Sequence, residues 1–204
     1  MNQFIDAPIS LFLLIANVMV SGYALFSDPG LIDRLSFRPR AITERREYYR
    51  FITAGFVHGS VPHLLFNLFT LYFFGPFLEG VLGPLRFMVV YFGSELSAHA
   101  LTWWRHKNTP GYSAVGASGA IAGVVFAFCL FRPFQLLYVF FALPVPAWLF
   151  AIAFVVISVM AMKGKVASGG IAHEAHLGGA IGGLVLTMVV EPRSIGYFLG
   201  QLGF

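Results

Sequence analysis

Apolar residues gather in six long runs separated by short polar segments, and this pattern predicts the secondary structure of the chain. The runs extend over Ile9 to Phe26, His63 to Phe77, Leu85 to Trp104, Ser113 to Phe131, Pro146 to Met162 and Gly169 to Val190. Each run approaches the ~20 residues that a helix needs to cross a bilayer, and none alternates as a barrel strand does. Because a helix satisfies its own backbone hydrogen bonds within lipid, we expect transmembrane helices. The predicted fold class is an all-α membrane protein, a six-transmembrane-helix bundle that forms a single domain over residues 1–204.

Composition agrees with this prediction. Of 204 residues, 58% are hydrophobic and 11% are charged, against about 45–50% and about 25% in soluble domains. The first run could instead be a cleaved secretory signal, but Met1 to Pro8 contain no Lys or Arg and include Asp6, so we expect a retained span. The lone cysteine, Cys129, excludes an intramolecular disulfide and is expected to pack within the fourth helix.

The fifth helix is expected to begin near a pair of prolines. Apolar sequence runs without a charge from Phe134 to Met162, which is longer than one span requires. Pro144 and Pro146 divide it, and proline suits the first turn of a helix while disfavouring helix just before it. The fifth helix should therefore start near Pro146, and residues 134–143 should lie at the membrane interface or in a connection.

The one sizeable polar segment is a first loop, about residues 27–50, between the first and second spans. It contains six arginines and four acidic residues, so it supplies +2 of the net charge of +4. A nucleic-acid patch and a surface for anionic lipid headgroups are both conceivable. We favour a solvated basic loop at the lipid surface and expect no nucleic-acid partner.

Four polar side chains within the apolar runs are expected to converge. The second, fourth and sixth helices of a six-span chain run in the same direction, so residues near their starts lie under the same membrane face. His63 and Asn67 begin the second helix, Ser118 lies about five residues into the fourth, and His176 lies about seven into the sixth. At ~1.5 Å rise per residue, all four lie roughly 10 Å below the surface at most.

These residue types suit acyl transfer. A serine hydroxyl needs a base, so we predict Ser118 as the nucleophile and His176 as the general base. The oxyanion would be held by the side chains of His63 and Asn67, four apart on one helix face, and by the backbone N–H of Ser118 near a helix start. Glycines allow membrane helices to approach closely, and they line both helices at Gly119, Gly123, Gly178, Gly179, Gly182 and Gly183.

At this point the chain resembles the rhomboid family of intramembrane serine proteases. The matching positions are Tyr49-Arg50, His58-Gly59-Ser60, His63 to Asn67, Gly75, Glu79, Gly83, the Gly116-Ala117-Ser118-Gly119-Ala120 run and the Ala175-His176-Leu177-Gly178-Gly179 run. The resemblance implies a rhomboid-like bundle, a Ser118–His176 dyad without an acidic third member, and an oxyanion site using His63 and Asn67. It implies cleavage of transmembrane protein substrates in the lipid bilayer, with no cofactor and no metal. We expect a multi-pass protein of the cell membrane, the inner membrane in a bacterium.

Two departures from the family pattern concern the first loop and the base. Tyr49 stands where bacterial members often have tryptophan, and Ala122 stands where some members have a tyrosine that packs on the histidine ring.

The string from His173 through Glu174 to His176 is similar to a zinc-protease helix, but its histidines are three apart instead of four. We therefore expect His173 and Glu174 to line the cavity mouth with Gly116, and we expect His106 to lie solvated in a loop.

Charge and function leave two questions open. Loops after the first, third and fifth helices carry ten Lys or Arg, against three on the opposite face, so the positive-inside rule places the active-site face in the cytoplasm. The family topology implies the opposite orientation, and we favour it because the first loop is expected to fold as a unit. The alternative functions are a non-catalytic rhomboid-like protein that escorts membrane segments, and a transporter, for which no convincing repeat is seen.

Overall fold

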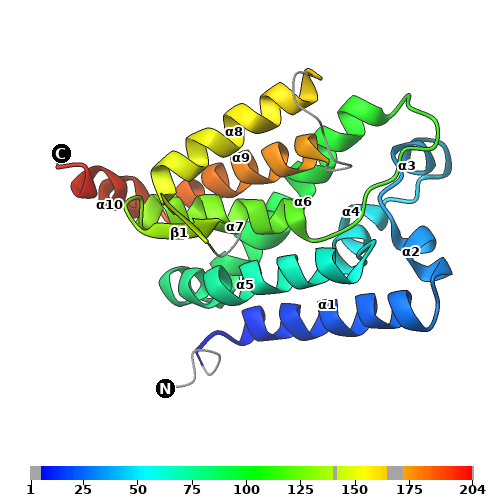
Figure 1. Ribbon diagram of the computed structural model, residues 1–204, viewed down its shortest axis with the longest axis horizontal. Helices are drawn as coiled ribbons and strands as arrows, with labels where there is room; N and C mark the ends of the chain where they lie inside the picture. The colour runs from blue at the N-terminus through cyan, green and yellow to red at the C-terminus, as the bar shows by residue number, and fades with distance from the viewer. Residues whose placement is uncertain (1–5, 140–141, 165–171, 204) are drawn as a thin grey trace.

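The computed structural model describes residues 6–139, 142–164 and 172–203, and most of these are helical. The helices are α1 (Pro8–Phe26), α2 (Gly30–Leu35), α3 (Pro39–Arg45), α4 (Arg50–Thr53), the 3₁₀ turn η1 (Ala54–Phe56), α5 (Val61–Leu82), α6 (Pro84–His106), α7 (Ser118–Phe131), α8 (Ala147–Met162), α9 (His173–Val190) and α10 (Arg193–Gln201). The strands are β1 (Leu136–Val139) and β2 (Leu143–Pro146). Helices α5, α7 and α9 all begin at the end of the bundle where α2 and α3 lie (Figure 1).

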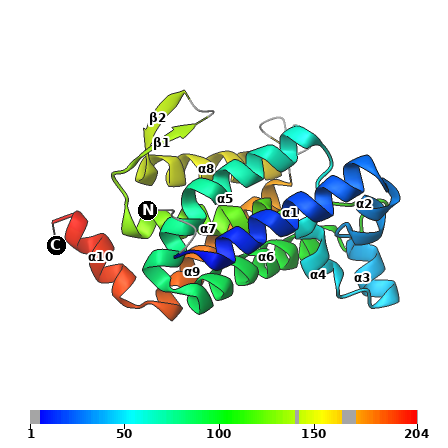
Figure 2. The same cartoon turned by 90° about the horizontal axis from the view of Figure 1, so that it is seen from below.

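Helix α7 is the core of the bundle. Every residue of this helix after Ser118 is buried, as expected for a helix that is hydrophobic all round. Helices α5, α6 and α9 pack around it (Figures 1 and 2). Phe74 and Phe77 of α5 both place their rings edge-on to Phe128, with centroids 5.0 Å apart. The backbone that carries Ser118 is thus held on several sides.

The outer helices expose large apolar side chains, as lipid-facing surfaces do. Examples are Phe12 and Met19 of α1, Phe73 of α5, Ile152 of α8 and Val189 of α9, each more than half exposed. By length and composition, α1, α5 and α9 are able to cross a membrane, and α7 and α8 are shorter apolar helices. The count of six spans stays a prediction. Its sixth run lies partly outside the described residues, at 169–171.

A buried carboxylate near the end of α5 joins this helix to the start of α1. The carboxylate of Glu79 accepts hydrogen bonds from the backbone N–H of Ile9 (2.9 Å), the N–H of Ser10 (2.7 Å) and the Ser10 hydroxyl (2.8 Å). The carboxyl group of Glu79 thus accepts from amides at the start of α1 that have no partner within the helix. Helix α5 therefore continues past its expected end at Phe77, through Glu79, to Leu82.

The polar first loop is folded, as the expectation that it forms a unit required. It contains α2 and α3 and leads into α4, and its arginines pair within it, as Arg40 does with Glu44 at 2.6 Å. Phe37, Ile42 and Ala54 form a small buried cluster. Backbone hydrogen bonds between Phe37 and Ala114 (2.8 and 3.0 Å) attach this segment to the chain that leads into α7.

The fifth helix begins where the prolines predicted, at Ala147 directly after Pro146. The connection before it is an antiparallel hairpin in which Leu136 pairs with Pro146. Figure 2 shows the hairpin and α10 projecting at the end of the bundle away from α2 and α3. Gln201 of α10 donates to the Phe131 carbonyl at 2.8 Å, so α10 covers the end of α7.

Candidate active site

Ser118 is the first residue of α7, and the prediction that it lies about five residues into the helix was wrong. The helix starts late because Gly116 adopts φ +107°, a conformation that interrupts a helix and favours glycine. The Gly116 N–H donates to the carbonyl of Ala54 at 2.9 Å, so this backbone is committed to a contact outside the helix. His176 is the fourth residue of α9.

The structure brings Ser118 and His176 together. The Ser118 Oγ and His176 Nε2 atoms are 2.8 Å apart, within hydrogen-bond distance. Both side chains are half-buried, so solvent and a ligand can reach them. Because Nε2 must be unprotonated to accept the hydroxyl proton, the contact suits a neutral imidazole acting as a base.

Glycines make this contact geometrically achievable, as predicted. A Cβ atom built on Gly179 would lie 2.0 Å from the Gly119 carbonyl oxygen, and one on Gly183 would lie 2.3 Å from the Gly123 Cα. Helices α7 and α9 therefore touch backbone to backbone at two successive turns. Any larger side chain at these crossings would separate the two helices.

His58 was assigned no catalytic contact from the sequence, yet it supports the residue before the nucleophile. It is fully buried, and its Nε2 accepts from the Ala117 N–H at 3.4 Å while its Nδ1 lies 2.7 Å from the Ser21 hydroxyl. The Ser21 hydroxyl donates onward to the Phe56 carbonyl at 2.8 Å, which makes Nδ1 the protonated nitrogen. Burial lowers the pKa of His58 to about 3, so its imidazole is neutral.

The two predicted oxyanion donors lie differently. The His63 ring is packed over Gly116, where an added Cβ would meet its Cε1 at 2.5 Å and its Nε2 at 2.7 Å. Asn67 is buried, and its side-chain amide donates to the His63 carbonyl at 2.9 Å on its own helix. Its role as an oxyanion donor therefore stays a prediction. Gly116, expected to line the cavity, is buried beneath the His63 ring.

Glu174, predicted with His173 to line the cavity mouth, is buried and engaged with other side chains, and its place at the mouth stays a prediction. Its carboxylate accepts from the Tyr112 hydroxyl at 2.5 Å and lies 3.1 Å from His106 Nε2. His106, expected to be solvated, ends α6 and stacks on Tyr112 with centroids 3.8 Å apart. Burial, together with the bond to Glu174, raises the pKa of Tyr112. His173 is half-buried, with its ring edge-on to His176 at 6.3 Å.

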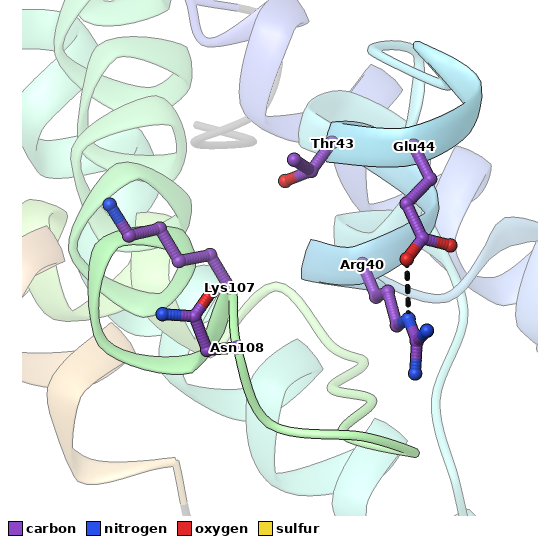
Figure 3. A pocket seen from close by; sticks show the side chains of 5 residues that line it. All are labelled: Arg40, Thr43, Glu44, Lys107 and Asn108. Atoms are coloured by element: carbon purple, nitrogen blue, oxygen red, sulfur yellow. Dashed lines mark hydrogen bonds and ion pairs between the residues drawn. The ribbon is translucent and has the colours of Figure 1, made fainter.

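A separate polar hollow of about 340 Å³ lies between α3 and the end of α6, lined by Arg40, Thr43, Glu44, Lys107 and Asn108 (Figure 3). The Lys107 ammonium and the Arg40 guanidinium point away from one another, and Arg40 is paired with Glu44. Lys107 lies over the Trp103 ring at 5.4 Å. These cations do not converge on a common ligand, and the hollow is distinct from the Ser118–His176 site.

Comparisons with known proteins agree on one family. The family model described as Rhomboid domain matches residues 45–193. The "Putative rhomboid protease YdcA" of Bacillus subtilis (strain 168) is 41% identical over 78 residues, which cover 38% of this chain and 38% of that protein. The "Inactive RHOMBOID-like protein 8" of Arabidopsis thaliana is 33% identical over 86 residues, covering 42% and 24%.

A mitochondrial relative extends the match further along this chain. "Rhomboid protein 1, mitochondrial" of Saccharomyces cerevisiae (strain ATCC 204508 / S288c) is 32% identical over 139 residues, covering 66% of this chain and 39% of that protein. The matches thus span less than half the length of these three relatives. Their names include a protease and an inactive protein, so the activity of this chain has to be argued from its own site.

Proposed function

Because the chain belongs to the rhomboid family, we propose that it is an intramembrane serine endopeptidase that cleaves transmembrane segments of other proteins. The observation that carries the proposal is the 2.8 Å contact between Ser118 Oγ and His176 Nε2, made by residues of two helices that cross at glycine pairs. Ser118 is the nucleophile and His176 the general base.

The reaction follows the chemistry of these two groups. Ser118 Oγ attacks the scissile carbonyl carbon while His176 Nε2 accepts the hydroxyl proton, which gives a tetrahedral intermediate. His176 then donates that proton to the departing amine, and an acyl-enzyme ester remains on Ser118. Water attacks the ester while His176 again accepts a proton. As this second tetrahedral intermediate collapses, His176 returns the proton to Ser118 Oγ, which releases the carboxylic acid and the free serine.

The developing oxyanion requires donors close to Ser118. The Ser118 N–H lies at a helix start and has no acceptor among the described residues, so it is available. The His63 ring over Gly116 is a second donor, and Asn67 becomes a third if its amide turns from the His63 carbonyl when substrate binds. Removal of one such donor typically costs ~100- to 1000-fold in rate.

The short length of α7 supports a reaction below the membrane surface. Its 14 residues extend about 21 Å, against a hydrocarbon core of about 30 Å. A helix that begins below the surface leaves Ser118 at a depth where it can meet a transmembrane segment. Substrates should contain helix-weakening residues there, because a stable helix commits its carbonyls to internal hydrogen bonds. The six-span topology and a place in a bacterial inner membrane belong to the same proposal.

The rival function is a non-catalytic rhomboid-like protein that binds membrane segments, and one relative is named as inactive. The preserved Ser118–His176 contact favours the protease. The test is cleavage of a model transmembrane substrate by the purified protein, beside Ser118→Ala and His176→Ala. Ser113→Ala, an exposed serine five residues earlier, is the matched control.

We expect both site variants to lose cleavage and the Ser113→Ala control to retain it. Equal cleavage by the wild type and Ser118→Ala would refute the proposed protease function, and binding of the segment without cleavage would favour the rival.

A further inference from the structure

The hydrogen bond between His176 Nε2 and Ser118 Oγ does not by itself fix the orientation of the imidazole ring, so a further contact is needed to hold it. The residue one turn after Ser118 is Ala122, whose methyl group is too small to stack on an imidazole. The ring that lies beside His176 comes from a different helix. Phe154 of α8 faces the imidazole with ring centroids 5.9 Å apart and planes inclined by 25°.

Small residues on two helices make room for this ring. Ala122 of α7 and Ala180 of α9, one turn after His176, are both buried and belong to one apolar cluster with Phe126. Phe154 packs against that cluster and meets the Phe126 ring edge-on, with centroids 5.4 Å apart. A bulky side chain at position 122 would compete for the space that Phe154 occupies.

A second phenylalanine lies next to Phe154 on α8. The Phe150 ring, one turn earlier, lies 5.8 Å from the Phe154 ring and is tilted by 38°. No stacking contact between Phe150 and His176 occurs among the described residues. The two phenylalanines therefore share a helix and a side-chain type, but of the two only Phe154 stacks on His176.

We propose that Phe154 is a positioning residue that holds His176 in line with Ser118, so that α8 supplies the aromatic support that Ala122 on α7 lacks. This inference rests on the proposed protease function. An aromatic face limits rotation of the imidazole and favours the cation that forms when the base accepts a proton. The ring acts through the imidazole, so its loss should slow turnover more than it weakens substrate binding.

The test is steady-state cleavage of a transmembrane substrate by the whole protein, with kcat and KM measured separately. Phe154→Leu should lower kcat by about tenfold, since misalignment of a catalytic group by ~1 Å can cost up to ~100-fold, while KM should stay within about twofold. Phe154→Tyr keeps the ring and should stay near the wild type. Phe150→Leu makes the same change one turn away and is the matched control.

A second readout separates alignment from folding. The rate at which a fluorophosphonate labels Ser118 should fall together with kcat in Phe154→Leu. The thermal unfolding midpoint of Phe150→Leu measures how much stability is lost when a ring of α8 is removed. Adding Ala122→Tyr to the Phe154→Leu background should restore part of kcat, because a ring then returns from α7. Should Phe154→Leu not fold, Phe154→Met removes the ring with less loss of volume and takes its place.

The outcomes are distinct. If Phe154→Leu keeps the wild-type kcat, or if Phe150→Leu or Phe154→Tyr loses as much kcat as Phe154→Leu does, the positioning role of Phe154 is overturned while the proposed function stands. Wild-type protein that cleaves no faster than Ser118→Ala overturns the proposed function and this inference with it.

Discussion

Substitution of Gly179 by alanine tests whether helix separation controls the dyad. The added Cβ would lie 2.0 Å from the carbonyl oxygen of Gly119, and ordinary contact begins at 3.4 Å, so the overlap is about 1.4 Å. The atoms that the added Cβ would meet belong to the backbone of Gly119, and a helix backbone cannot rotate away as a side chain can. Helices α7 and α9 must therefore move apart by a distance of this order.

The expected effect on the site follows from that separation. The Ser118–His176 contact is 2.8 Å and spans the same two helices one turn or less from the crossing. An increase of about 1 Å takes it beyond hydrogen-bond distance, and a misplacement of this size costs about 100-fold in rate. Overpacking should also destabilise the fold by about 1–3 kcal/mol.

The assay compares kcat for substrate cleavage and the thermal unfolding midpoint of Gly179→Ala with those of a matched glycine variant. Gly80→Ala is suitable, because Gly80 lies within α5 and a Cβ there meets nothing within 4 Å. We expect a large loss of kcat in the first variant and none in the second. Wild-type kcat in Gly179→Ala would refute the reasoning that the glycine crossing sets the dyad distance.

Three other predictions concern pH, capping and topology. Burial lowers the pKa of His58 to about 3, whereas an unfolded histidine has a pKa of about 6.5. Between these two pH values the unfolded chain binds more protons than the folded protein, so the free energy of unfolding should fall as the pH drops, by up to about 1.4 kcal/mol per pH unit. The unfolding midpoint should depend less steeply on pH in His58→Asn than in the wild type, and an equal slope in both proteins would contradict this. Glu79→Gln should lower the unfolding midpoint, with a cost of about 1–3 kcal/mol for weakened bonds to the start of α1, and unchanged stability would show that the cap contributes nothing. A reporter inserted beside Arg40 should lie outside the cytoplasm, because the first loop is folded as a unit and folded segments cross a membrane largely regardless of their charge; a cytoplasmic reporter would favour the positive-inside count.

Local pattern was sufficient for the long apolar helices and for the two side chains that the structure brings into contact, Ser118 and His176. Apolar runs near the length of a span predicted α1, α5, α6 and α8, since lipid admits little else than helix. The proline pair located the start of α8 to within one residue. Ser118 and His176 were identified because their motifs fall at the starts of helices that run in the same direction.

Long-range contacts account for what the sequence could not supply. The late start of α7 depends on bonds from Gly116 to Ala54, and from Ala117 to His58, which are about sixty residues apart in the chain. Likewise, nothing local signals that a carboxylate two residues before the base is buried against Tyr112. Packing between distant segments decides such pairs, and periodicity within one segment does not report it.

The contacts at the start of α7 are selective in a way that bears on catalysis. The N–H groups of Gly116 and Ala117 bond to Ala54 and His58, and the N–H of Ala120 donates to the Glu95 carboxylate at 3.0 Å.

Ser118 and Gly119, between these anchored amides, have no backbone N–H acceptor among the described residues. A helix start normally leaves several amides free. Here three acceptors, one each from η1, from the segment before α5 and from α6, leave only the amides of Ser118 and Gly119 free among the described residues. Fixed on both sides, these amides need little reorganisation to bind an oxyanion, which is the condition under which such donors lower a barrier most.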